Sequence, residues 1–412
     1  MNLFEQVKLQ YEEAKKIMNL DEDIENILTF PKNEIIIHYP IVMDNNKLKI
    51  IKGYRVQHNN VLGPYKGGIR MSDDIYLDEI KSLAFWMTLK CSLQELPYGG
   101  GKGGIKINPN DYSKRELERI SRGYAENMFK YFGEDKDIPA PDLGSNSQIM
   151  DWMVDAHQKK ANTHNIGIYT GKSVECGGSY GRNQATGYGV SKCIELWCNK
   201  KSININNTTF IVHGFGNVGS HAAYYLHSLG SKCIGVADHT RNLYFKDGID
   251  INDLIKHCEK NKTLKNFNKG IDIDNFFSIK CDIIVPCSKE NVITNENVMT
   301  IDCKLIAEGA NGPVNYNAEK ILENNKVEII PDILANSGGV LVSYYEWLQN
   351  KRCEYWTEEK VMEKLSVQME KIYDKCYNEM SHRNITMRQA CYILAINRIK
   401  LIIEKRNIYL KN

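Results

Sequence analysis

The feature that most constrains the fold of this chain is a glycine motif placed directly between an apolar strand and a helix. Residues 209–212, Thr-Phe-Ile-Val, are typical of a strand, and the helical pattern after the motif runs to Leu229. Glycines at such a turn let the helix N-terminus approach a pyrophosphate closely. The next expected strand, 233–237, ends at Asp238, and an acid about 20 residues beyond the motif is placed to meet an adenosine ribose. The sequence therefore predicts a dinucleotide site formed by Gly214, Gly216, Val218, Gly219 and Asp238.

The alternative for this motif is a glycine turn in some other α/β fold. Further short apolar strands are expected at 283–285, 305–307 and 328–330, and helical patterns separate them. Short apolar strands alternating with helices are typical of a parallel, doubly wound sheet. The fold class is therefore α/β, with a Rossmann-type dinucleotide-binding domain. The last segment, 340–412, is expected to be helical throughout.

The N-terminal half has a different pattern. Two strands are expected at 34–43 and 47–58, because the Asp-Asn-Asn sequence between them favours a turn. Glycine-rich segments at 63–70 and 99–104 are interpreted as loops, and helices are expected at 2–18, 77–96 and about 114–132. Residues 138–142 are expected to be extended, because two prolines restrict the backbone there. We expect an α/β domain over 1–185, the dinucleotide-binding domain over 186–339 and C-terminal helices over 340–412.

Composition excludes several classes of protein. The chain has 412 residues, and its 53 Lys and Arg nearly balance its 51 Asp and Glu, so no excess of positive charge indicates a nucleic acid or a membrane surface as partner. No apolar run approaches the roughly 18 residues that would cross a bilayer. The 12 cysteines are scattered without a Cys-x-x-Cys pair, which argues against a zinc site and against a disulfide framework. We expect a cytoplasmic protein with reduced thiols and no bound metal.

Three lysines and one aspartate stand in unusual surroundings. Lys102 has glycines on both sides, Lys66 directly precedes two glycines, Lys90 lies on an expected helix, and Asp142 follows two prolines. A lysine that is desolvated or placed near other cations has a lowered pKa and can act as a neutral base near pH 7. The alternatives are a solvated lysine on a flexible loop and, for Asp142, an N-cap of the helix expected at 148–156.

At this point the motifs add up to a family resemblance. Their order, and their spread over nearly the whole chain, resemble the glutamate/leucine/phenylalanine/valine dehydrogenase family, and most closely its shorter, hexamer-forming glutamate dehydrogenases. The matching segments are 63–70, 96–105, 138–144, 185–189, 214–219, 307–311 and 335–340. The resemblance implies that 1–185 binds substrate and forms the oligomer, a homohexamer, and that the C-terminal helices pack back toward this first domain.

The resemblance also implies catalytic and substrate-binding roles. Lys102 matches the catalytic lysine and Asp142 the aspartate that transfers protons. Lys90 matches the lysine that binds the α-carboxylate of the substrate. The pair that binds the distal carboxylate of glutamate is matched by Lys66 and Ser337, with Thr186 nearby. Three ammonium groups at one site would also help to keep one of them unprotonated.

For the dinucleotide, the resemblance implies contacts from Thr186, Asn217 and Asn311. Two departures from the family pattern bear on the coenzyme alone: the Cys-Ser pair at 287–288, where small residues are common, and the His-Thr-Arg sequence at 239–241. A carboxylate at Asp238 favours NAD, because it binds a free ribose hydroxyl and repels a 2′-phosphate. Arg241 and His239 lie close by in the sequence, so NADP stays open.

The resemblance implies an enzyme that interconverts L-glutamate with 2-oxoglutarate and ammonia, transferring a hydride to NAD or NADP. One alternative is a dehydrogenase that acts on leucine, valine or phenylalanine. Those relatives carry apolar residues at the positions of Lys66 and Ser337, because an apolar side chain is penalised beside an unpaired ammonium. The other is a scaffold without activity, which would have no physical need to keep Lys102 or Asp142.

Overall fold

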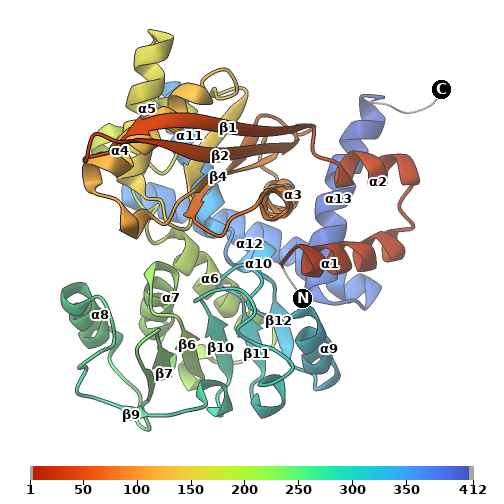
Figure 1. Ribbon diagram of the computed structural model, residues 1–412. Helices are drawn as coiled ribbons and strands as arrows, with labels where there is room; N and C mark the ends of the chain where they lie inside the picture. Colours follow the sequence, from red (N-terminus) through yellow and green to blue (C-terminus); the bar gives the residue numbers. More distant parts are fainter. Residues whose placement is uncertain (1–2, 408–412) are drawn as a thin grey trace. The chain divides into compact units, whose positions relative to one another are not determined.

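The computed structural model describes residues 3–407, which divide into two compact units (Figure 1). One unit contains residues 15–182, 340–361 and 393–407; we call it the lysine unit, because Lys66, Lys90 and Lys102 lie in it. The other contains residues 3–14, 183–339 and 362–392, and we call it the glycine-motif unit. Each unit is therefore assembled from segments that lie far apart in the sequence.

The lysine unit is built on a five-stranded mixed sheet in the order β1-β2-β4-β3-β5. Antiparallel pairing joins β1 to β2 and β2 to β4, whereas β3 runs parallel to both β4 and β5. The strands are β1 Asn33–Val42, β2 Leu48–Asn59, β3 Tyr65–Ser72, β4 Gly100–Lys106 and β5 Asp137–Pro141. The helices of residues 15–182 are the end of α1 (Leu3–Met18), α2 Glu22–Thr29, α3 Leu77–Leu93, α4 Lys114–Asn127 and α5 Ser147–Ala161. Two predictions for this unit are confirmed. The strands expected at 34–43 and 47–58 pair as β1 and β2, and the segment 138–142, expected to be extended, lies mostly in β5.

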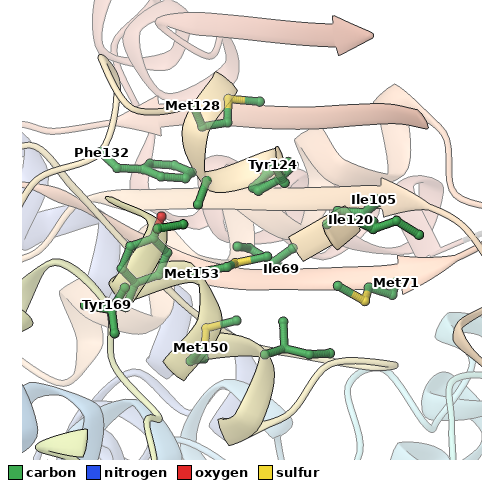
Figure 2. Close-up of a cluster of buried hydrophobic side chains, with 14 of the residues drawn as sticks. Ile69, Met71, Ile105, Ile120, Tyr124, Met128, Phe132, Met150, Met153 and Tyr169 are labelled. Atoms are coloured by element: carbon green, nitrogen blue, oxygen red, sulfur yellow. The ribbon is translucent and has the colours of Figure 1, made fainter. Parts of the chain in front are cut away.

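Helices cover both faces of this sheet. On one face α3 packs over β2 through Ile80 and Ala84. On the other face α4 and α5 enclose the main core of the unit, where Tyr124 donates a hydrogen bond from its hydroxyl to the carbonyl of Tyr54 at 2.7 Å. Figure 2 shows this core, with Ile69, Met71, Ile105, Ile120, Tyr124, Met128, Phe132, Met150, Met153 and Tyr169 labelled. The strands of this sheet are therefore held in place by packed helices on both faces.

The prediction that 63–70 and 99–104 form loops is wrong, because these segments contain β3 and β4, two interior strands of the sheet. Glycine is usually unfavourable in strands, which is why the sequence favoured loops. Here the glycines allow backbones to approach closely: a Cβ on Gly67 would lie 1.6 Å from the carbonyl oxygen of Gly101, and one on Gly100 would lie 2.1 Å from Oγ1 of Thr88. The expected helices also end earlier than predicted, α3 at Leu93 and α4 at Asn127.

The glycine-motif unit is built on a seven-stranded sheet in the order β12-β11-β10-β6-β7-β8-β9. Its strands are β6 Thr209–His213, β7 Lys232–Ala237, β8 Asn242–Tyr244, β9 Ile271–Asp272, β10 Ile283–Pro286, β11 Leu305–Ala307 and β12 Glu328–Ile330. From β12 to β7 all neighbours are parallel, which confirms the doubly wound sheet. The antiparallel edge formed by β8 and β9 was not predicted, because these strands are too short for a periodic signal.

The helices of the glycine-motif unit include α1 Leu3–Met18, whose first residues pack in this unit, α6 Ala185–Lys200, α7 Asn217–Ser228, α8 Ile251–Asn261, α9 Tyr316–Asn324 and α10 Asp332–Ala335. Short 3₁₀ turns occur in both units. Those of the lysine unit are Pro109–Asp111, Ile166–Ile168 and Val174–Cys176, and those of the glycine-motif unit are Ile205–Asn207, Phe276–Ser278 and Val298–Thr300. No helix within residues 3–407 is both long and apolar enough to cross a bilayer.

The C-terminal part forms α11 Gly338–Arg352, α12 Glu358–Arg383 and α13 Met387–Lys405. Most of α11 and the larger part of α13 belong to the lysine unit, whereas most of α12 belongs to the glycine-motif unit. The predicted return of C-terminal helices to the first domain is therefore confirmed. The prediction of helix without interruption fails at two short breaks, 353–357 and 384–386, and its last residues lie outside the described part.

Candidate active site

Lys102 and Asp142 form an ion pair across strand β3 in the lysine unit. Lys102 lies on β4 and Asp142 directly follows β5, and β3 runs between these two strands. Glycine makes this approach possible, because a Cβ on Gly68 of β3 would lie 2.7 Å from the Cβ of Asp142. Asp142 does not cap the next helix, since Asn146 is the N-cap of α5.

The pair combines a carboxylate that stays ionised with an ammonium that loses its proton easily. Burial lowers the pKa of Lys102, the guanidinium groups of Arg70 and Arg55 lower it further, and Asp142 opposes them without reversing the shift. Burial raises the pKa of Asp142, but the charges of Lys102 and Arg70 lower it more, so that it lies well below its ordinary range. Such a pair is suited to proton transfer.

Lys66 is almost completely buried, with 1% of its surface exposed. It lies on β3, where its Nζ donates a hydrogen bond to the carbonyl of Ile138 at 3.2 Å. Burial lowers the pKa of Lys66 to about 7, and Arg182 lowers it as well. The cations with the largest effect on the pKa values of Lys66 and Lys102 are therefore arginines.

The ammonium groups of Lys66 and Lys90 both affect the pKa of one buried thiol, that of Cys91. Burial raises the pKa of Cys91 to about 12, and the ammonium groups of Lys66 and Lys90 partly oppose this shift. Lys90 is half-buried near the C-terminal end of α3, one residue before Cys91. The structure thus gathers all the predicted lysines and Asp142 within the lysine unit.

Two arginines of this site were missed in the sequence. Arg70 places its Nε 3.6 Å from Oδ2 of Asp142 and also binds Glu79 at 2.6 Å. Arg182 donates a hydrogen bond from Nε to Oγ of Ser343 at 3.2 Å and lies near enough to Lys66 to lower its pKa. The signal for Arg70 was its place at the end of the first glycine-rich segment, whereas Arg182 has no distinctive spacing.

A buried ion pair fixes the segment beside β5. Oε1 of Glu346 lies 2.7 Å from Nζ of Lys172, and its other oxygen accepts a hydrogen bond from the backbone N–H of Gly171 at 2.8 Å. The neighbouring N–H of Thr170 donates to the carbonyl of Pro139 on β5 at 3.0 Å. Because both charged side chains are fully buried, this clamp supports the strand that ends at Asp142.

In the glycine-motif unit, the three glycines have different roles. Gly214 has φ +102°, and a Cβ there would lie 2.5 Å from the backbone nitrogen of Ser288. A Cβ on Gly219 would lie 1.9 Å from the carbonyl oxygen of Gly214, so this glycine lets α7 pack on the turn. Gly216 faces open space at the N-cap of α7, with no side chain capping the helix. This cradle fits the pyrophosphate of a dinucleotide, whose charge the helix N-terminus would stabilise.

Thr186 lies in the first turn of α6, which packs tightly against the turn that carries Ser337. A Cβ on Gly338 would lie 2.0 Å from the carbonyl oxygen of Ala185. The hydroxyl of Ser337 donates to the carbonyl of Leu334 at 2.6 Å, which orients it within the turn. Asn217 begins α7, and its amide donates to the carbonyl of Asn183 at 2.9 Å.

Asp238 holds together the loop after β7. Its Oδ1 accepts hydrogen bonds from the N–H and hydroxyl of Thr240 at 2.7 and 2.6 Å, and its Oδ2 accepts one from the N–H of Leu264 at 2.7 Å. Burial raises the pKa of Asp238, but these hydrogen bonds lower it more, so the carboxylate is ionised. Arg241 is bound to Asp272 at 2.8 and 2.7 Å. The third nitrogen contact of Arg241, to the carbonyl of Phe267 at 2.7 Å, completes its binding.

Asn311 follows β11, and the amide of Asn336 donates a hydrogen bond to its Oδ1 at 2.9 Å. The predicted coenzyme residues and Ser337 therefore lie together in the glycine-motif unit. Within residues 3–407, no group of three or more His, Cys, Asp and Glu side chains is arranged to hold a metal ion.

Comparisons with known proteins find one family over most of the chain. Residues 177–406 match the family model for Glutamate/Leucine/Phenylalanine/Valine dehydrogenase, and residues 31–159 match the model for the dimerisation domain of the same family. The glutamate dehydrogenase of Thermotoga maritima is 40% identical over 411 residues, covering 99% of each chain. The NAD-specific glutamate dehydrogenase of Peptoniphilus asaccharolyticus is 42% identical over 400 residues and 95% of each chain.

Solved structures show the same similarity. The structure of the Peptoniphilus asaccharolyticus glutamate dehydrogenase matches with a TM-score of 0.88 at 39% identity, covering 99% of this chain and 100% of that one. A hetero-hexameric glutamate dehydrogenase from Thermus thermophilus matches with a TM-score of 0.94 at 29% identity, covering 99% and 98%. On this evidence the chain belongs to the Glutamate/Leucine/Phenylalanine/Valine dehydrogenase family.

Proposed function

We propose that this protein catalyses the reversible oxidative deamination of L-glutamate to 2-oxoglutarate and ammonia, with NAD as its coenzyme. It is a glutamate dehydrogenase by its similarity over nearly the full length to enzymes of that activity. The proposed residue roles rest on one observation: Lys102 and Asp142 form an ion pair in a unit that also buries Lys66.

The lysine unit would bind the substrate by contacts to the two carboxylates of the substrate. Lys90 binds the α-carboxylate, and Lys66 binds the distal carboxylate together with Ser337 and, near it, Thr186. A buried ammonium without a full counter-charge favours an anionic side chain and penalises an apolar one. This supports glutamate over leucine, valine or phenylalanine. Two fixed contacts at opposite ends orient Cα for the reaction and contribute to the rate through proximity.

Lys102 and Asp142 would transfer the protons. NAD, held at the glycine motif, would supply the acceptor for the hydride of the substrate Cα. Water then attacks the substrate imine, and neutral Lys102 takes a proton from that water. Asp142, whose carboxylate lies in contact with the Lys102 amine, would relay this proton to the nitrogen of the hydrated imine, which then leaves as ammonia. Arg70, placed 3.6 Å from Asp142, lowers the pKa of that carboxyl and so favours its return to the ionised form after each transfer.

The coenzyme would be held by the first turn of α7 and its neighbours. Gly214, Gly216, Val218 and Gly219 form the turn that receives the pyrophosphate, with Thr186, Asn217 and Asn311 around it. Asp238 would bind the adenosine ribose, and its negative charge disfavours a 2′-phosphate. Arg241 is already bound to Asp272 and Phe267, which weakens the case for NADP. The Bacillus subtilis and Peptoniphilus relatives are NAD-specific, in agreement with this choice.

We further propose a homohexamer in the cytoplasm. The chain contains the dimerisation domain of its family, and one of its structural neighbours is a hetero-hexamer. All twelve cysteines are free thiols, as expected in a reducing compartment. Sedimentation of the purified protein tests the assembly, and a dimer as the largest species would contradict the hexamer.

A steady-state assay tests the activity. The rate of NADH or NADPH formation is measured with glutamate, leucine, valine and phenylalanine, each with NAD and with NADP. We expect kcat/KM for glutamate with NAD to exceed all other combinations by at least about 100-fold, which corresponds to about 2.7 kcal/mol. Activity on a branched or aromatic amino acid that equals activity on glutamate would remove the proposed substrate.

A further inference from the structure

Arg388 lies between three buried carboxylates in the glycine-motif unit. Its Nη2 donates to Oε2 of Glu308 at 2.8 Å, its Nε to Oε1 of Glu319 at 2.7 Å and its Nη1 to Oδ1 of Asp332 at 3.2 Å. All four residues are at most 4% exposed. A single guanidinium therefore binds side chains from three separate elements: the end of β11, α9 and α10.

Two of these carboxylates organise the segments that carry proposed site residues. Glu308 stands at the start of the segment 308–312, and Asp332 at the start of the turn that leads to Ser337. Oδ2 of Asp332 accepts a hydrogen bond from the N–H of Gly312 at 2.9 Å, and Oε2 of Glu308 accepts one from the N–H of Asp332 at 2.8 Å. Each segment thus holds the other, and Arg388 binds both.

A second link joins the far ends of the same two segments. The amide of Asn336 donates to Oδ1 of Asn311 at 2.9 Å and to the carbonyls of Gly309 and Ala310 at 3.3 and 3.2 Å. Asn336 directly precedes Ser337 in the chain. A shift of the segment 332–337 would therefore also move the side-chain amide of Asn311.

We propose that Arg388 is a positioning residue for the reaction, which holds the segments 308–312 and 332–337 in register so that Asn311 meets the coenzyme and Ser337 the distal carboxylate. The inference rests on the roles given to Asn311 and Ser337 in the proposed function. Arg388 touches neither ligand in this scheme and acts only through Glu308 and Asp332.

The chemistry of the cluster requires an arginine. Three carboxylates around one cation would carry an excess of negative charge, but burial raises the pKa of Glu308, and Asp332 and Glu319 raise it as well, against Arg388. A protonated Glu308 reduces that excess. The planar guanidinium presents donors in three directions, whereas the ammonium of lysine is a point charge on a flexible chain. Arg388→Lys therefore keeps the charge and loses the geometry.

The test compares Arg388→Lys with Arg383→Lys, a matched exchange at an ion pair on α12 that is 40% exposed on the arginine side. We expect Arg388→Lys to raise KM for glutamate and for NAD each by roughly tenfold, because misplacement of contact groups by about 1 Å can cost up to about 100-fold. Arg383→Lys should change neither. The hexamer and the melting temperature are measured for both variants.

A double-mutant cycle separates positioning from a general structural role. In a Ser337→Ala background, Arg388→Lys should no longer raise KM for glutamate, and in an Asn311→Ala background it should no longer raise KM for NAD. Effects that multiply in full, or unchanged KM values in a folded Arg388→Lys enzyme, would overturn the proposal. If Ser337→Ala and Asn311→Ala are themselves without effect, the residue roles of the proposed function fail, and the inference falls with them.

Should Arg388→Lys not fold, Asp332→Asn provides the second variant, because it keeps the shape of the side chain and loses one of its acceptors. The expected result is the same pair of raised KM values with the same cancellation in the two backgrounds. A folded Asp332→Asn enzyme with native KM values for both ligands would contradict the proposal.

Discussion

The Lys102 ammonium contacts the Asp142 carboxylate across strand β3, where Gly67 and Gly68 have no side chains that would block the contact. A side chain on Gly68 would collide with Asp142, so the glycines of β3 are what allow an acid and a base from β4 and β5 to meet.

This pair gives the first prediction. Lys102→Ala and Asp142→Asn should each lower kcat by roughly 100-fold or more, as the loss of acid–base catalysis usually does. The dissociation constant of NAD should stay within about threefold, since the coenzyme residues lie in the other unit. Lys102→Arg is the control: it keeps the positive charge but cannot become neutral, so it should be as inactive as the alanine variant. Native turnover in any of these variants would remove the mechanism.

Much of the fold could be predicted from the sequence because its strongest signals are local. The strand, glycine turn and helix around Gly214–Gly219 follow from residue patterns within about 30 positions, and the structure confirms them. By contrast, β3 and β4 were mistaken for loops, since strand formation there depends on tertiary contacts between glycine backbones, which no local propensity records.

The site could be predicted only in part. The lysines and Asp142 stand in unusual local sequence, so they could be selected, and the resemblance supplied their roles. Arg182 and Glu346 have ordinary neighbours in sequence, and their effect on the site arises through contacts between distant segments, such as the bond of Glu346 to Gly171. Arg388, which binds carboxylates 56 to 80 positions away, was invisible for the same reason.

The second prediction concerns the protonation of Lys66. Burial lowers its pKa to about 7 in the free enzyme, and a bound carboxylate favours the charged ammonium. Above pH 7, binding of a dicarboxylate should therefore take up a proton, and affinity should fall by up to about tenfold per pH unit. Calorimetry with glutarate in buffers of different ionisation enthalpy measures this uptake.

Lys66→Arg should abolish the proton uptake, since the guanidinium is always charged. Lys66→Leu with Ser337→Val should lose glutamate and admit norvaline, leucine or methionine, because removal of a desolvated charge pair costs about 2–5 kcal/mol. An unchanged ratio of kcat/KM for glutamate over leucine in the double variant would show that these residues do not read the distal carboxylate.

A third prediction contrasts two glycines of one motif. Gly216 faces open space with φ −85°, so Gly216→Ala should fold with a native melting temperature. Its new methyl group would occupy the place of the pyrophosphate, and the dissociation constant of NADH should rise by roughly tenfold, or about 1.4 kcal/mol. Gly219→Ala should instead lower the free energy of unfolding by about 1–3 kcal/mol, because its Cβ would lie 1.9 Å from the carbonyl oxygen of Gly214.

Fluorescence titration with NADH and calorimetric melting distinguish the two outcomes. Tight NADH binding by a folded Gly216→Ala enzyme would mean that the coenzyme does not approach this turn.

The fourth prediction concerns the buried clamp beside β5. Lys172→Met should lower the free energy of unfolding by about 3–5 kcal/mol, because it leaves the carboxylate of Glu346 buried without its cation. Adding Glu346→Gln should recover part of this loss, since a neutral amide still accepts the hydrogen bond from Gly171. Lys159→Met, which breaks an ion pair whose lysine is 72% exposed, should change stability by less than about 1 kcal/mol. Equal melting temperatures for Lys172→Met and Lys159→Met would contradict the clamp.

The last prediction concerns the choice of coenzyme. Asp238 is fixed by the N–H groups of Thr240 and Leu264, and its pKa is lowered, so an ionised carboxylate stands where the adenosine ribose would bind. Asp238→Asn should therefore improve kcat/KM for NADP relative to NAD by roughly tenfold or more, since the repulsion of the 2′-phosphate is removed. Arg241 is bound through three nitrogens to Asp272 and Phe267, so it has no donor fork left for that phosphate in this arrangement. Arg241→Ala should leave the NAD to NADP ratio within about threefold of the native value. A native preference for NADP that collapses in Arg241→Ala would show instead that this arginine leaves Asp272 to bind the phosphate, and that Asp238 does not set the choice.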